Sequence, residues 1–169
     1  MIGSRNDTRL LFPGLAGFYA SWSEISYALL RVAVGAILFV HGWGKVTGAG
    51  LSGVSGYMGK LGLQPGIVFG GAAMFIETVG ALCLLVGLFT RFFAAALAIE
   101  MLIAMLTVHL AKGFGVGAGG YEYVLLLGVV LFSIASAAAK PCGACTKTKA
   151  IAIRGGGPYS VDAKMGKEL

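Results

Sequence analysis

Four long apolar stretches dominate the sequence and constrain its fold more than any other feature. They cover residues 25–44, 66–88, 92–111 and 121–139. An α-helix needs roughly 20 apolar residues to cross the hydrocarbon core of a bilayer. Such a segment must also satisfy its backbone hydrogen bonds internally, which a helix does. The sequence therefore predicts an all-α fold, an integral membrane four-helix bundle.

The composition agrees with a lipid environment. Charged residues make up 12% of the chain and the mean hydropathy is +0.87, whereas roughly 25% of residues are charged in a soluble domain. The 28 glycines are tolerated in membrane helices, because small residues let neighbouring helices approach closely. Gly66 with Gly70, and Ala94 with Ala98, have the small-xxx-small spacing that predicts helix contacts.

Three segments lie outside the four spans. Residues 1–24 are expected to form an interfacial N-terminal segment, with Tyr19 and Trp22 at headgroup level. Residues 51–63 are too interrupted by glycine to span and are expected to form a short helix at the interface. Residues 140–169 form a basic C-terminal tail.

The distribution of Lys and Arg predicts the orientation. With four spans both termini lie on one side, and that side carries nine basic residues against three opposite. The positive-inside rule then places both termini in the cytoplasm. The formal charge of +6 is explained by orientation, so we expect the partner to be the lipid bilayer and not nucleic acid. The nine are Arg5, Arg9, Arg91, Lys140, Lys147, Lys149, Arg154, Lys164 and Lys167; the three are Lys45, Lys60 and Lys112.

Several ionisable residues fall inside the spans, where a charge costs roughly 2.5 to 3.5 kcal/mol. Arg31, Glu77 and Glu100 should therefore face the interior, and Arg31 is expected to reach Glu77 or Glu100 as an interhelical ion pair. With Arg91, they are candidates for structural pairing, although intramembrane ionisable residues are also candidates for function. Glu100 and His109 are nine residues apart, which on a regular α-helix places them on opposite faces, away from a shared small pocket.

A second polar group is expected near the outer face. His41 and Lys45 end the first span, His109 ends the third, and Glu122 begins the fourth. Two imidazoles beside a carboxylate at the membrane–water interface suit proton transfer or binding of a quinone carbonyl. His41 and His109 are therefore candidates for quinone binding. The alternative is that these side chains form only structural hydrogen bonds, which determine which helices pack next to each other. We expect no metal site, because the spacing matches no ligand motif.

Cys142 and Cys145 form a CxxC sequence directly after the fourth span. A single CxxC can be a redox dithiol, half of a zinc site, or a pair without function. In the cytoplasm, the thiols are expected to be reduced.

These residues together resemble the DoxX family of small four-helix bacterial membrane proteins. The resemblance extends from about Tyr27 to Leu169, interrupted by residues 140–149, which look like an insertion. It rests on Arg31 with Gly35, His41-Gly42 with Lys45, Glu77 with Gly80, Gly87-Leu88-Phe89-Thr90-Arg91, His109, Gly113-Phe114, Gly119-Gly120-Tyr121-Glu122, and the tail Gly155-Gly156-Gly157-Pro158-Tyr159-Ser160-Val161-Asp162.

The resemblance implies a multi-pass protein of the bacterial inner membrane. It also implies a link to quinone-dependent sulfur-compound oxidation or to thiol oxidation. No haem, flavin or iron-sulfur motif occurs in the sequence, so we expect no intrinsic cofactor, with quinone as the candidate ligand and a redox partner or larger membrane complex as the electron source. The alternative is a non-catalytic accessory subunit of a larger respiratory or photosynthetic complex.

Overall fold

The computed structural model describes Gly14, residues 16–136 and Val161. Every regular element of residues 16–136 is a helix, which confirms the predicted all-α fold. Cys142, Cys145 and the rest of the segment 137–160 lie outside the described residues.

The first predicted span is the longest helical run. It consists of α1 (Ala16–Gly44), the π-helix η2 (Lys45–Ala49) and α2 (Gly50–Lys60). Helix α1 begins well before residue 25, so residues 16–24 continue the spanning helix without a break. The short helix expected within residues 51–63 is present as α2.

The other three spans have helical counterparts. The second contains α3 (Gly66–Phe75), the π-helix η3 (Ile76–Gly80) and α4 (Ala81–Val86). The third contains α5 (Thr90–Ala104), the π-helix η4 (Met105–His109) and the 3₁₀ turn η5 (Leu110–Lys112); a further 3₁₀ turn, η6 (Val116–Ala118), then leads to α6 (Glu122–Ser136).

The membrane-spanning character of these helices is clear from their length and their outer surface. Ser21–Lys60, Gly66–Val86 and Thr90–Lys112 are each long and apolar enough to cross a bilayer, and the described part of α6 is shorter. Large apolar side chains point outward, including Leu29, Val40, Phe92 and Phe132. In lipid such exposure has no hydrophobic cost, because the acyl chains are as apolar as the side chains.

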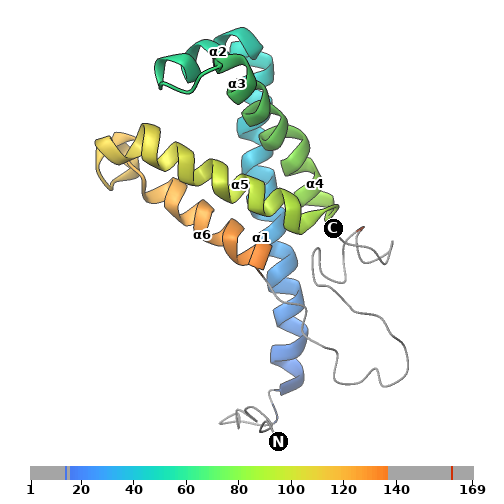
Figure 1. The fold of residues 1–169 in the computed structure, drawn as a ribbon. Helices are drawn as coiled ribbons and strands as arrows, with labels where there is room; N and C mark the ends of the chain where they lie inside the picture. Colours follow the sequence, from blue (N-terminus) through green and yellow to red (C-terminus); the bar gives the residue numbers. More distant parts are fainter. Residues whose placement is uncertain (1–13, 15, 137–160, 162–169) are drawn as a thin grey trace, which may run out of the picture.

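The bundle consists of one long helix with two helical units packed against it (Figure 1). Helix α1 packs along η3 and α4, α2 packs on α3, and α5 pairs with α6. Residues of all these spans meet in one apolar core that includes Leu38, Leu84, Leu97 and Leu131.

Glycines allow the closest approaches in this packing. A Cβ on Gly66 would collide with the carbonyl oxygen of Ser55, and a Cβ on Gly70 would lie only 3.0 Å from the nitrogen of Ser55, so the predicted small-xxx-small pair of α3 is a contact with α2. Gly35 of α1 packs similarly against Leu85 of α4. These contacts bring the backbones together, which is how membrane helices gain dispersion energy without a hydrophobic driving force.

Two buried or half-buried arginines donate hydrogen bonds to helix carbonyl oxygens. Arg31, only 2% exposed, donates from Nη1 to the carbonyl oxygens of Leu84 (2.5 Å) and Leu85 (2.8 Å) near the end of α4. The last carbonyls of a helix lack intrahelical donors and carry the negative end of the helix dipole, so a guanidinium at the end of α4 is favourable. Arg91 donates from Nε to the carbonyl oxygen of Ala135 (3.2 Å) in α6.

Candidate functional site

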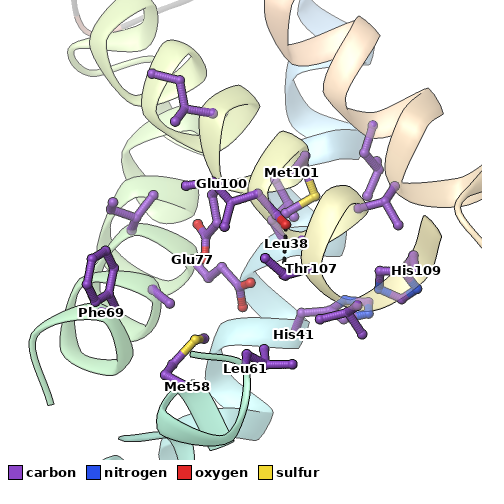
Figure 2. Close-up of a pocket in the computed structure, with 18 of the residues that line it drawn as sticks. Leu38, His41, Met58, Leu61, Phe69, Glu77, Glu100, Met101, Thr107 and His109 are labelled. Atoms are coloured by element: carbon purple, nitrogen blue, oxygen red, sulfur yellow. Dashed lines mark hydrogen bonds between the residues drawn. The ribbon is translucent and has the colours of Figure 1, made fainter. Parts of the chain in front are cut away.

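A cavity of about 460 Å³ lies in the half of the bundle that contains the C-terminal end of α1. Its walls come from the C-terminal part of α1, from α2, from α3 with η3, from α5 with η4, and from the start of α6. Most of the lining is apolar, as the side chains of Leu38, Met58, Leu61, Phe69 and Met101 show in Figure 2. We call this cavity the chamber.

Five acidic or basic side chains line the chamber: His41, Lys45, Glu77, Glu100 and His109. The structure thus brings together His41, Lys45 and His109 from the predicted outer group, and adds the two glutamates of the second and third spans. Glu122 does not line this chamber. Its Oε2 accepts a hydrogen bond from the backbone N–H of Val116 (3.1 Å), which orders the η6 turn.

Lys45 and Glu77 form an ion pair. Lys45 Nζ lies 2.5 Å from Glu77 Oε1, and the side chains are 32% and 7% exposed. A buried carboxylate in lipid requires such a partner. The structure therefore gives Glu77 a different partner from the one expected, because the side chain of Lys45 reaches back from the end of the first span while Arg31 binds the end of α4.

Glu100 lies close enough to Glu77 and Lys45 to interact electrostatically with both. Figure 2 shows the two glutamates on neighbouring helices at one wall of the chamber. Glu77 Oε2 and Glu100 Oε2 are buried and accept no hydrogen bond from a donor group in the described residues, but the two carboxyl groups lie within hydrogen-bond reach of each other. Buried polar atoms are nearly always hydrogen-bonded, and one proton shared between the two carboxyl groups would satisfy both oxygens.

Both histidines are oriented by a backbone carbonyl. His41 Nδ1 lies 2.9 Å from the carbonyl oxygen of Ile37, and His109 Nδ1 lies 2.7 Å from that of Gly119. A carbonyl oxygen can only accept, so Nδ1 carries the hydrogen in each ring. In the neutral imidazole, Nε2 is then the acceptor.

Each of three chamber residues lies in a π-helical turn. Lys45 is in η2, Glu77 in η3 and His109 in η4. A π turn closes i→i+5 hydrogen bonds, so it holds one more residue than an α turn, and such turns are frequent at functional sites. The five residues of η4 advance roughly as far around the axis as four α-helical residues. Glu100 and His109 both line the chamber, so the expectation that they lie away from a shared pocket is wrong.

Each of these π turns has a threonine as its third residue. Thr47 donates its hydroxyl to the carbonyl of Trp43 (2.9 Å), Thr78 to that of Met74, and Thr107 to that of Ile103 (2.8 Å). Threonine that bonds back to the carbonyl four residues earlier distorts α-helical geometry. The threonine hydroxyl therefore stabilises the point at which the backbone hydrogen bonds change from the i→i+4 to the i→i+5 pattern.

Sequence reasoning missed the contribution of α2 and of the tyrosines. Tyr57 from α2 and Tyr123 from α6 line the chamber, together with Thr107 of η4. The threonines within the apolar spans were the available signal for the π turns, since threonine is a weak helix former that competes for backbone carbonyls.

The comparisons with known proteins identify the family. The DoxX family profile matches residues 26–110, which contain His41, Lys45, Glu77, Glu100 and His109. A protein of Bacillus subtilis (strain 168) named "Putative oxidoreductase CatD" is 36% identical over 104 residues, which cover 62% of this chain and 74% of that protein. No solved structure matches the chain. The chain belongs to the DoxX family.

Proposed function

We propose that this protein is a membrane subunit of a quinone-linked redox system and that the chamber binds the quinone ring. The observation that carries the proposal is the combination of an apolar chamber within a membrane bundle and polar groups on its wall, namely a pair of glutamates and two histidines. A lipid-soluble ring suits the apolar lining, and its oxygen substituents suit the polar groups on the wall. The oxidoreductase name of the Bacillus relative supports the same class of activity.

Side chains of this protein would exchange protons with the bound quinone ring. A quinone takes up two electrons and two protons to become a hydroquinone, so a site for it needs groups that exchange protons beside the ring. The imidazoles of His41 and His109 and the carboxyl of Glu100 are such groups. Lys45 holds Glu77 in place through the 2.5 Å ion pair. The two electrons would come from a partner protein that carries a redox centre, so we propose a complex with such a partner.

The orientation forms part of the proposal. We propose that the protein is multi-pass in the inner membrane with both termini in the cytoplasm, on the basis of nine basic residues on the terminal side against three opposite. The chamber then lies in the outer half of the membrane. Fusions of a reporter that is active only outside the cytoplasm should be active in the segment 113–120 and inactive after residue 169.

The test of quinone binding is direct extraction. The full-length protein is purified in mild detergent, its lipids are extracted, and quinone is quantified by mass spectrometry per protein. We expect a quinone content near stoichiometric in the unaltered protein and at least fivefold lower in His41→Ala with His109→Ala. Glu122→Gln is the matched control, because Glu122 lies outside the chamber and glutamine can still accept from Val116.

An equal and sub-stoichiometric quinone content in all three proteins would reject the proposal. Stable copurification with a large complex that keeps full turnover when His41 and His109 are replaced would instead support the non-catalytic accessory subunit.

A further inference from the structure

Two glutamates and one lysine meet on the wall of the chamber. Lys45 Nζ lies 2.5 Å from Glu77 Oε1, and Glu100 interacts electrostatically with both residues and lies within hydrogen-bond reach of Glu77. The three residues come from three different helical segments, η2, η3 and α5, and Figure 2 shows the two glutamates on the same wall. We call Lys45, Glu77 and Glu100 the carboxyl triad.

The charges of the carboxyl triad do not balance when both glutamates are ionised. Two carboxylates and one ammonium leave one net negative charge, and this charge would lie within a membrane bundle, where Glu77 is buried. An uncompensated charge is costly at that depth. A single proton on the two carboxyl groups makes the triad neutral.

The contact between the two carboxyl groups requires the same proton. Glu77 Oε2 and Glu100 Oε2 accept no hydrogen bond from a donor group in the described residues, and the two groups lie within hydrogen-bond reach of each other. An ionised carboxylate only accepts, whereas a protonated carboxyl also donates. Two ionised groups at this range would repel each other, so the contact is favourable only when one of them carries a proton.

We infer that Glu77 and Glu100 together form a binding site for one exchangeable proton, with Lys45 balancing the remaining negative charge. The proton belongs to the pair and not to either residue, as in other carboxyl pairs that share one proton. This site does not depend on which ring the chamber binds. Under the proposed function it would supply one of the two protons that the ring takes up, and a proton from water would then replace it.

Other positive groups could balance the charge, but they do not explain the contact between the carboxyl groups. His41 and His109 line the chamber, as do the uncharged hydroxyls of Tyr57 and Tyr123. A charged imidazole would leave the two carboxylates in contact without a proton between them. Among the described residues, no group of three or more His, Cys, Asp or Glu side chains could hold a metal ion. A proton satisfies both the charge and the hydrogen bond.

Infrared spectroscopy tests the site, because the carbonyl stretch of a protonated carboxyl lies apart from the carboxylate bands and shifts in D₂O. The full-length protein is measured at neutral pH in a detergent without ester groups, where carboxyl groups in water are ionised. We expect a band from one protonated carboxyl per chain. Glu77→Gln and Glu100→Gln each leave a single carboxylate for Lys45, so both variants should lose this band, whereas Glu122→Gln, outside the chamber, should keep it.

The variant Lys45→Met distinguishes a shared proton from a single protonated glutamate. Without the lysine, neutrality requires a proton on each carboxyl group, so the band should about double. A band that is absent from the unaltered protein would overturn the inference. A band that is unchanged in both Glu77→Gln and Lys45→Met would also overturn it, because the proton would then belong to Glu100 alone.

Spectra in sodium, potassium and tetraalkylammonium chloride test whether a small cation takes the place of the proton. We expect the same band in all three salts, and a band that appears only without sodium and potassium would assign the site to a cation instead. The proposed function is decided separately by the quinone content of the purified protein. A protein with the band and without quinone would keep the proton site and lose the proposed function, and the opposite result would do the reverse.

Discussion

Gly42 of α1 lies directly on the backbone of Glu77 in η3. A Cβ at position 42 would stand 2.5 Å from the carbonyl carbon of Glu77 and 2.8 Å from the nitrogen of Thr78. No side chain fits at that separation, so the two helices touch through their main chains. The contact also places Lys45, less than one turn further along the first span, within reach of the Glu77 carboxylate.

Replacing this glycine should separate the two helices. Gly42→Ala is expected to destabilise the protein by about 1 to 3 kcal/mol, because the backbone of η3 cannot give way as a flexible side chain could. Gly44→Ala is the control, since nothing lies within 4 Å of a Cβ there and alanine is the better helix former. Thermal unfolding in detergent measures both; equal melting temperatures for the two variants would contradict the packing argument.

The Lys45–Glu77 ion pair should show strong coupling. Removing one partner of a buried pair costs about 3 to 5 kcal/mol, because the other charge is left uncompensated, and partial exposure of Lys45 places Lys45→Met at the lower end of that range. The double variant Lys45→Met, Glu77→Gln should be more stable than Lys45→Met alone. A double-mutant cycle on unfolding free energies measures the coupling, and additive effects would show that the pair contributes nothing.

The hydroxyl of Thr107 should stabilise the π turn η4. Thr107→Val keeps the shape and removes the donor to Ile103, which should cost about 1 kcal/mol and disturb the position of His109. Thr107→Ser retains the hydroxyl and should keep the chamber intact. Ligand titration and thermal unfolding distinguish these outcomes; a serine variant as impaired as the valine variant would assign the effect to the lost methyl group.

Arg31 should be required for its geometry as well as its charge. Arg31→Met leaves the carbonyls of Leu84 and Leu85 without this donor inside the bundle, and each unsatisfied buried group costs roughly 1 to 3 kcal/mol. Arg31→Lys keeps the charge but not the planar fork, so its stability should be intermediate. A lysine variant as stable as the unaltered protein would show that charge alone suffices.

The sequence was sufficient to predict the helices, but not the contacts of the polar residues between them. Four apolar runs predicted the spans because lipid requires continuous helical backbone, and residues 66 and 70 correctly indicated a close helix contact. The partner of Glu77 could not be predicted, because the choice between Arg31 and Lys45 depends on which helix ends lie within reach. The shared chamber of Glu100 and His109 was missed because spacing arguments assume 3.6 residues per turn, and η4 departs from that value.

The three π turns also determine where the chain can lose a residue. Deletion of Leu106 inside η4 would shorten that turn to an ordinary α turn while Glu100 and His109 kept their common orientation, and Leu106 itself is 56% exposed. The same deletion at Ala98, within the regular part of α5, would rotate everything beyond it by about 100° and turn the lipid-facing side chains inward. Length variation in this helix should therefore be confined to the segment that carries His109, where one residue can be removed without rotating the rest.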